Sequence, residues 1–270
     1  MAFSTIITPP EAAPFVGDPD WLFVDCRATL GQPGAGRVAY LREHVAGAVF
    51  ADLDTELSAP VVPGVTGRHP LPDEEEFEAT AGRLGIGPET QVVAYDESNG
   101  AMAAARLWWL LHWAGHDEVA VLDGGLDTWR AAGLPLARGV EQRPATVFTG
   151  RFREAIAVGA AALEGRTLVD ARAEDRFRGE NETVDPVAGH IPGAVSLPFA
   201  GNVGADGRFL APAALAERYA GLIEPVFYCG SGVTAAHSVL AYAHAGLGTA
   251  ALYPGSWSEW ITDPSRPVER

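Results

Sequence analysis

The sequence predicts an α/β protein built from two copies of one domain, each with a mostly parallel sheet that helices cover on both faces. Two observations carry this prediction: blocks of sequence recur in order, and short apolar runs rich in β-branched residues alternate with helical patterns. Strands that alternate with helices are typical of parallel sheets buried on both faces. A chain of 270 residues is long enough for two such domains.

Four blocks of sequence are found twice in the same order, which indicates an internal duplication. The pairs are LFVDCR (22–27) and TLVDAR (167–172), EHVAGAVFADL (43–53) and GHIPGAVSLPF (189–199), VVAYDESNGAMAAARL (92–107) and PVFYCGSGVTAAHSVL (225–240), and LDGGLDTW (122–129) and LYPGSWSEW (252–260). We therefore expect an N-terminal domain over 1–137, a polar linker over 138–153 and a C-terminal domain over 154–270.

The elements of the second copy follow from its apolar periodicity. The expected strands are TLVD (167–170), AVSL (194–197), VFYC (226–229) and AALY (250–253), and the expected helices are 211–222, 233–246 and 256–262. In the first copy, the acidic run 73–76 predicts the first turn of a helix, where carboxylates suit the helix dipole. Functional groups of such folds follow the carboxyl ends of strands, the position that Cys229 and its counterpart Asp96 occupy.

Composition argues against several classes of protein. The net charge of −16 disfavours binding to nucleic acid or to an acidic membrane. No apolar run is long enough to span a membrane, and the N-terminus lacks a signal-peptide pattern, so we expect a cytoplasmic protein. The only cysteines are Cys26 and Cys229, and neither has the spacing of a zinc site. We expect no metal and no organic cofactor.

The segment after the third expected strand of the second copy predicts an anion-binding turn. A buried strand ends at Cys229, two glycines let the next residues curl tightly, and a helix begins near Val233 or Thr234. Such a turn aims backbone N–H groups into one concavity at a helix N-terminus, which stabilises a thiolate. The candidate residues are Cys229 as nucleophile, with Gly230, Ser231, Gly232, Val233 and Thr234 cradling its sulfur and the donor.

The loop by itself also fits a buried structural cysteine. The first copy has Asp96 and Glu97 in the same place, and two carboxylates would repel an anion, so only the second copy is equipped for anionic chemistry. A cradle after a cysteine suits sulfur transfer or phosphoester hydrolysis. A Cys-dependent phosphatase needs an arginine that closes the loop around the phosphoryl oxygens, and Thr234 and Ala235 stand in its place.

Together with the loop CGSGVTA (229–235), three other blocks make the chain resemble the tandem-rhodanese sulfurtransferases, within them the 3-mercaptopyruvate sulfurtransferase branch. These blocks are GHIPGA (189–194), DGG (123–125) followed by Trp129, and GSW (255–257) followed by Glu259 and Trp260. The resemblance implies an inactive N-terminal rhodanese domain, an active C-terminal one, and a site in the cleft between them.

The resemblance also extends to the sulfur donor. Thiosulfate-preferring members have basic residues directly after the cysteine, whereas Gly230 and Ser231 are neutral, as in mercaptopyruvate-type members. Arg176 matches the family arginine that binds the donor carboxylate. The second family arginine, nine positions on, is replaced by Asp185, which weakens the assignment of mercaptopyruvate; Arg178 is a candidate to compensate.

The mercaptopyruvate branch has an arrangement similar to that of serine proteases, in which an aspartate and a histidine of the first domain reach the loop serine. The matching residues are Asp54, His69 and Ser231. The resemblance implies that these residues assist proton transfer.

Several other polar or reactive side chains are expected to be structural. Cys26 has alanine at its place in the second copy, which predicts a small buried side chain without a redox role. The remaining expectations are ion pairs of Arg27 with Asp25 and of Arg172 with Asp170, and a shared structural role for His44 and His190. His237 is expected to be a packing residue, and Trp108, Trp109 and Trp113 are expected to pack in the core or at a domain interface.

The predicted function is transfer of a sulfane sulfur from 3-mercaptopyruvate, through a Cys229 persulfide, to a thiol such as a thioredoxin or to cyanide. The expected partners are therefore a small-molecule donor and a thiol acceptor. Two alternatives stay open: a thiosulfate:cyanide sulfurtransferase, and a non-catalytic sulfur-carrier or binding module.

Overall fold

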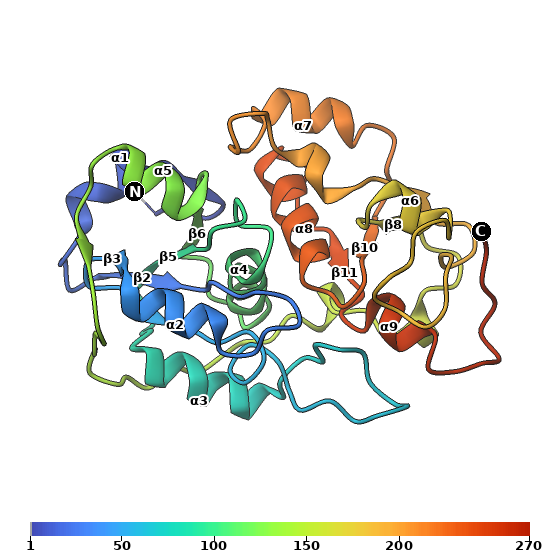
Figure 1. The fold of residues 1–270 in the computed structure, drawn as a ribbon, viewed down its shortest axis with the longest axis horizontal. Coiled ribbons are helices and arrows are strands. Elements are labelled where there is room, and N and C mark those ends of the chain that lie inside the picture. The colour runs from blue at the N-terminus through green and yellow to red at the C-terminus, as the bar shows by residue number, and fades with distance from the viewer. Residues whose placement is uncertain (1) are drawn as a thin grey trace. The chain divides into compact units, whose positions relative to one another are not determined.

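The computed structural model describes residues 2–270, and its chain divides into two compact units. Of these residues, unit 1 contains 2–59, 72–153 and 205–209, and unit 2 contains 60–71, 154–204 and 210–270 (Figure 1). The predicted boundaries differ from this division in three segments, of which the linker 138–153 is part of unit 1. Residues 60–71 lie with unit 2, although the duplication assigns them to the first copy, and 205–209 lie with unit 1.

The predicted linker over 138–153 packs along unit 1. The N–H of Thr146 donates to the Gly82 carbonyl oxygen at 2.9 Å, and the N–H of Arg151 donates to the Ala114 carbonyl oxygen at 2.8 Å. These bonds satisfy backbone groups that a free linker would leave to water.

Unit 1 is built on a five-stranded parallel sheet with the strand order β1-β6-β5-β2-β4. The strands are β1 (Ile6–Ile7), β2 (Trp21–Asp25), β4 (Val49–Phe50), β5 (Gln91–Tyr95) and β6 (Val119–Leu122). The helices are α1 (Pro9–Ala12), α2 (Ala35–Arg42), α3 (Glu74–Leu84), α4 (Ala103–Trp113) and α5 (Gly125–Ala131). A short antiparallel pair joins β3 (His44–Val45) to β7 (Leu136–Ala137).

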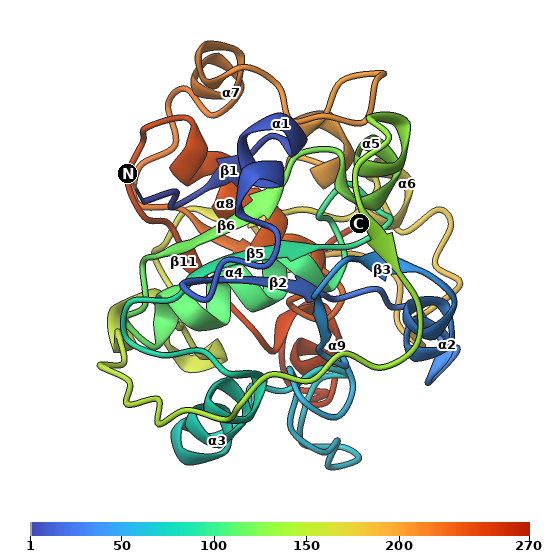
Figure 2. The ribbon, with the colours of Figure 1, turned by 90° about the vertical axis from the view of Figure 1, so that its left-hand side faces the viewer.

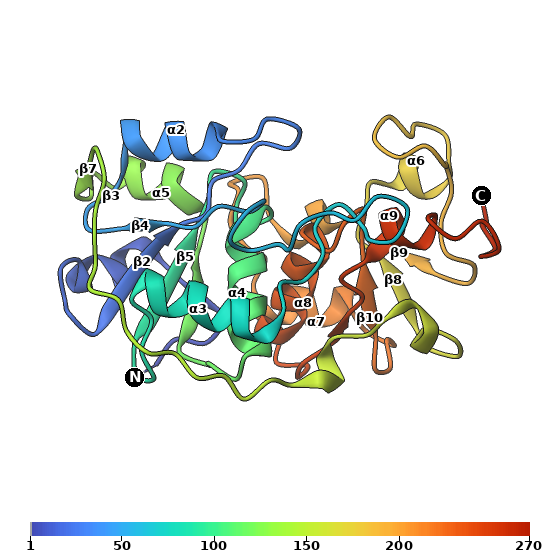
Figure 3. The same cartoon turned by 90° about the horizontal axis from the view of Figure 1, so that it is seen from below.

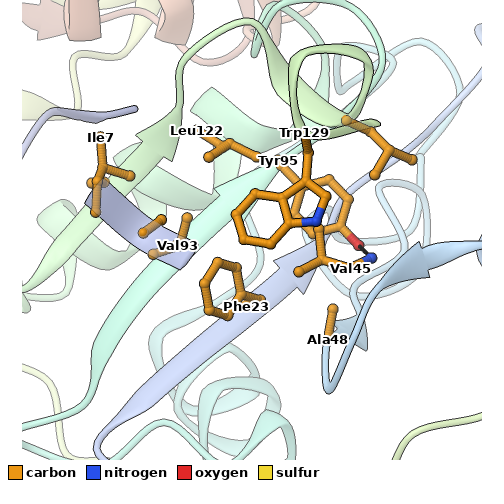
Figure 4. Close-up of a cluster of buried hydrophobic side chains, with 11 residues drawn as sticks. Ile7, Phe23, Val45, Ala48, Val93, Tyr95, Leu122 and Trp129 are labelled. Atoms are coloured by element: carbon orange, nitrogen blue, oxygen red, sulfur yellow. Dashed lines mark hydrogen bonds between the residues drawn. The ribbon is translucent and has the colours of Figure 1, made fainter. Parts of the chain in front are cut away.

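Helices cover both faces of this sheet, as predicted. Figure 2 shows α1 in front of the strands and α4 behind them. The face toward α1 and α5 is filled by side chains such as Phe23, Val93 and Leu122, which pack with Trp129 of α5 (Figure 4). Such burial of large apolar groups is the main favourable term in folding. On α4, Trp108, Trp109 and Trp113 are buried, as expected for core or domain-interface packing.

Unit 2 has a smaller parallel sheet with the strand order β11-β10-β8-β9. The strands are β8 (Leu168–Asp170), β9 (Val195–Ser196), β10 (Val226–Tyr228) and β11 (Ala251–Leu252), and the helices are α6 (Glu174–Phe177), α7 (Pro212–Arg218), α8 (Thr234–His244) and α9 (Ser256–Trp260). Figure 3 shows α8 along one side of β10. All four predicted strands and all three predicted helices of this copy are present. Short 3-10 turns complete the chain at Ala13–Phe15, Glu154–Ile156, Ala160–Ala162 and Phe199–Asn202.

Equivalent side chains of the two copies make equivalent contacts. Arg27 pairs with Asp25 at 2.7 Å, and Arg172 pairs with Asp170 at 2.6 Å, as predicted. His44 stacks on Tyr40, and His190 stacks on Phe177 in the same way. The Nδ1 atom of each histidine is hydrogen-bonded to the carbonyl oxygen of the residue on which it stacks. The shared structural role of these histidines is confirmed.

The acidic run at 73–76 begins a helix, as predicted. Asp73 is the N-cap of α3 and accepts a hydrogen bond from the N–H of Glu76 at 2.7 Å, so its carboxylate satisfies one free donor of the first turn. No helix over residues 2–270 has the length and apolar character needed to cross a membrane.

Candidate active site

The Cys229 loop connects β10 to α8. Cys229 directly follows the last residue of β10 and is only 2 % exposed. Gly232 has a φ of +78°, a left-handed conformation that only glycine adopts without strain, and its N–H donates to the Cys229 sulfur at 3.2 Å. A Cβ at this position would lie 2.4 Å from the Pro254 carbonyl oxygen. The backbone therefore turns sharply at Gly232, as predicted, and at least one backbone N–H points at the Cys229 sulfur.

Helix α9 supports the loop from the outside. The N–H groups of Trp257 and Ser258 donate to the carbonyl oxygens of Cys229 and Gly230, each at 3.0 Å. The hydroxyl of Ser256 accepts from the Cys229 N–H at 3.1 Å and donates to the Tyr253 carbonyl oxygen at 2.9 Å. Helix α9 therefore holds two carbonyl groups of the loop. No role was predicted for Ser256 from the sequence, although it lies in the GSW block.

His69 lies beside the loop within unit 2. Its Nδ1 atom is 2.8 Å from the hydroxyl oxygen of Ser231, and both side chains are buried. This hydrogen bond is possible within unit 2 because residues 60–71 pack there rather than in unit 1. An imidazole held against a buried hydroxyl can accept its proton and return it.

Arg176 lies next to the loop but is already held by carboxylates. Its Nε and Nη2 atoms donate to Glu182 at 3.0 and 2.9 Å, and Nη2 also donates to Asp185 at 3.0 Å. A Cβ on Gly230 would be 3.7 Å from Arg176 Nη1. The predicted donor arginine and the aspartate nine positions on are therefore ion-paired.

The two carboxylates beside Arg176 are perturbed in opposite directions. Burial raises the pKa of Asp185, although the guanidinium groups of Arg68 and Arg176 act against it. Burial also acts to raise the pKa of Glu182, but the N–H groups of Asp185 and Val184 and the Arg176 guanidinium outweigh it, so that pKa is lowered. At Asp185 the negative charge of Glu182 adds to the effect of burial, whereas at Glu182 hydrogen bonds to the charged form prevail over burial.

The other residues predicted for the site lie at different distances along the chain from Cys229 and in both units. Val233 is the N-cap of α8, and Thr234 is the first residue of that helix. Arg178 is half-exposed, and its guanidinium is held by Glu180 at 2.8 Å and Glu174 at 3.4 Å, so the structure does not bring it to the Cys229 loop. Asp54 belongs to unit 1, in the turn after β4, where its N–H donates to Asp52 at 3.0 Å.

The two remaining side chains that were predicted to be structural are buried. Cys26 is 0 % exposed, and burial raises the pKa of its thiol well above the usual range, which fits a side chain without a redox role. His237 is also 0 % exposed, and its Nδ1 atom lies 3.3 Å from the side-chain nitrogen of Asn202.

The corresponding loop of unit 1 is filled by its own aspartate. The carboxylate of Asp96 accepts hydrogen bonds from the N–H groups of Ser98, Gly100, Met102 and Ala104 at 2.7 to 3.3 Å. Glu97 points elsewhere and pairs with Arg27 and Arg130. The loop thus differs from the predicted pair of repelling carboxylates, because Asp96 alone occupies the donors that would hold an anion.

Replacing Asp96 with alanine should lower the free energy of unfolding of unit 1 by about 2–5 kcal/mol, because buried N–H groups lose their acceptor. The measurement is denaturant unfolding followed by tryptophan fluorescence. Asp127→Ala is the control, since its carboxylate is 73 % exposed and pairs with Arg130 at the surface, so its loss should cost less than about 1 kcal/mol. Equal stability of the two variants would contradict the role given to Asp96.

Comparison with known families decides the classification. The family model described as "Rhodanese-like domain" matches residues 8–132 and again residues 155–263. The chain belongs to the rhodanese-like family. Its two matches fall on the two copies that the duplication predicted.

Relatives of this rhodanese-like protein have names that specify two sulfur donors. A Pseudomonas aeruginosa protein named "Probable 3-mercaptopyruvate sulfurtransferase" is 48% identical, with 99% of each chain covered. A Mycobacterium tuberculosis protein named "Putative thiosulfate sulfurtransferase" is 43% identical, with 98% of this chain and 96% of the relative covered. The solved 3-mercaptopyruvate sulfurtransferase from Leishmania major has a TM-score of 0.87 and 36% identity, covering 98% of this chain and 75% of that one.

No cluster of three or more His, Cys, Asp or Glu side chains suited to a metal ion is found within residues 2–270. Cys229 with its loop is the candidate reactive centre of the rhodanese-like protein, because its sulfur accepts from the Gly232 N–H and Ser231 is hydrogen-bonded to His69 beside it.

Proposed function

We propose that this protein is a 3-mercaptopyruvate sulfurtransferase whose sulfur carrier is Cys229. The observation that carries the proposal is the Cys229 sulfur facing the N–H of Gly232 at 3.2 Å, with Ser231 hydrogen-bonded to His69 beside it. The neutral residues after the cysteine and the 3-mercaptopyruvate sulfurtransferases among its relatives favour this donor over thiosulfate.

The first half-reaction loads the cysteine. The Cys229 thiolate attacks the sulfur of 3-mercaptopyruvate, the carbon–sulfur bond breaks, and its electron pair leaves as the enolate of pyruvate. A proton delivered to the enolate carbon completes pyruvate, and Cys229 is left as a persulfide. We assign the delivery of that proton to Ser231 and His69, which their hydrogen bond supports, and the stabilisation of negative charge on sulfur to the N–H of Gly232.

The second half-reaction unloads the cysteine. An acceptor thiolate or cyanide attacks the outer sulfur, the sulfur–sulfur bond breaks, and the Cys229 thiolate is restored. No redox partner is consumed when cyanide is the acceptor, because the product is thiocyanate. Three predictions from the sequence stay predictions: a thiol acceptor such as a thioredoxin, a cytoplasmic location, and a role of Asp54 in proton transfer.

The donor assignment is tested by initial rates of thiocyanate formation from 3-mercaptopyruvate and from thiosulfate, with saturating cyanide in both assays. We expect kcat/KM to be at least about tenfold higher with 3-mercaptopyruvate, because a neutral loop attracts an inorganic dianion less. A preference for thiosulfate would make the protein a thiosulfate sulfurtransferase. A persulfide that forms without turnover would instead indicate a sulfur-carrier module.

A further inference from the structure

Ser256, the first residue of α9, has a backbone conformation that is unusual for a serine. Its φ is +56°, in the left-handed region that residues other than glycine rarely adopt. Within residues 2–270, the other non-glycine residues with positive φ are Asn99 and Glu224, neither of which is buried, whereas Ser256 is 0 % exposed. Such strain persists only where the surrounding structure holds the residue, and it is concentrated at functional sites.

The first copy of the domain has glycine at the same position. Gly125 begins α5 as Ser256 begins α9, and its φ is +62°. In both copies the N–H of the following residue donates to the carbonyl oxygen of the loop residue, Asp96 or Cys229, at 3.0 Å. The backbone therefore needs a left-handed residue here in both copies, and glycine meets this need without strain. Only the copy that contains the cysteine has a side chain at this position.

The Ser256 hydroxyl takes the place of a hydrogen bond between two strands. β10 and β11 are parallel neighbours, and the Tyr253 N–H donates to the Phe227 carbonyl oxygen at 2.9 Å. In a regular parallel ladder, the next bond would run from the Cys229 N–H to the Tyr253 carbonyl oxygen. The Cys229 N–H instead donates to the Ser256 hydroxyl at 3.1 Å, and this hydroxyl donates to the Tyr253 carbonyl oxygen at 2.9 Å. The inserted hydroxyl therefore separates the two strands at the nucleophile.

We propose that Ser256 is a positioning residue for sulfur transfer, whose hydroxyl keeps Cys229 out of the ladder and aims its sulfur at the Gly232 N–H. The inference rests on the proposed function, because it assigns Ser256 a part in the reaction of Cys229. Without the hydroxyl, the Cys229 N–H and the Tyr253 carbonyl either pair directly or stay unpaired. Direct pairing draws Cys229 toward β11, and loss of pairing releases it. Each displaces the sulfur from the N–H that it faces at 3.2 Å.

Replacing Ser256 with alanine should lower kcat for sulfur transfer from 3-mercaptopyruvate to cyanide about 10- to 100-fold, because a small displacement of a reacting atom is enough for such a loss. The KM for the donor should change less than about threefold, since Ser256 acts through Cys229 and does not bind the donor. Ser238→Ala is the control and should keep its kcat. Its hydroxyl is buried as well and accepts a hydrogen bond from the Asn202 side chain at 3.2 Å.

Ser256→Gly separates the hydroxyl from the backbone strain. Glycine also lacks the hydroxyl but adopts a positive φ freely, so this variant should resist denaturant better than Ser256→Ala. If the hydroxyl positions Cys229, both variants lose kcat to a similar extent although their stabilities differ. If kcat follows stability instead, so that Ser256→Gly keeps the activity that Ser256→Ala loses, Ser256 is only structural and the inference is overturned.

The outcomes distinguish this inference from the proposed function. If Cys229→Ser keeps the rates of the unmodified protein, the proposed function fails, and the inference fails with it. If Cys229→Ser abolishes sulfur transfer but Ser256→Ala keeps its kcat, or changes only the KM, the inference alone is overturned.

Discussion

Replacing Cys229 with serine should lower kcat/KM for sulfur transfer at least about 10³-fold, with 3-mercaptopyruvate as donor and cyanide as acceptor. Serine keeps the size of the side chain and its place opposite the N–H of Gly232, but a hydroxyl cannot hold a transferable sulfur. The measurement combines initial rates of thiocyanate formation with the intact mass of the protein after exposure to the donor alone. Unmodified protein should gain one sulfur atom, and Cys229→Ser should gain none.

Cys26 provides the matched control. It is the other cysteine of the chain, it is 0 % exposed, and burial raises the pKa of its thiol well above the usual range. A thiol that stays protonated and shielded does not act as a nucleophile. Cys26→Ala should therefore keep the activity and the mass gain. Wild-type rates in Cys229→Ser, or a sulfur found on Cys26, would contradict the proposed mechanism.

The local parts of this site could be predicted from the sequence. A strand end, two glycines and a helix start are encoded within a few residues, so the turn at Cys229 and its counterpart at Asp96 both follow from short-range pattern. The ion pair of Arg172 with Asp170 could also be predicted, because an arginine follows an aspartate two positions on in both copies. The two sheets follow from the same alternation of strands and helices.

Contacts of the site between residues far apart in the sequence could not be predicted from such local patterns. Segment 60–71 packs on unit 2, far along the chain from its neighbours there, and no local periodicity specifies such a contact. Asp185 could therefore be predicted to stand where the family has an arginine, but its partner could not be predicted from the sequence. That partner, Arg68, is 117 residues away in the sequence. Likewise, Glu97 was expected to face the loop, whereas the structure turns it toward Arg27 and Arg130.

Replacing Gly232 with alanine should lower kcat/KM about 10²- to 10³-fold, the loss typical for removal of one donor from an anion-binding site. Alanine is strained at a φ of +78°, and its Cβ would come within 2.4 Å of the Pro254 carbonyl oxygen, which belongs to the backbone. The loop must therefore shift, and the N–H that points at the Cys229 sulfur shifts with it. Initial rates and denaturant unfolding measure the two consequences.

Gly246→Ala separates strain from misplacement of the loop. Gly246 has a φ of +75°, close to that of Gly232, but a Cβ there meets nothing within 4 Å. Both variants should lose about 1–2 kcal/mol from the left-handed conformation, and only Gly232→Ala should lose further stability and activity. An equal loss of activity in both would mean that general destabilisation explains the effect. A selective loss in Gly232→Ala would mean that the direction of one backbone N–H sets the rate.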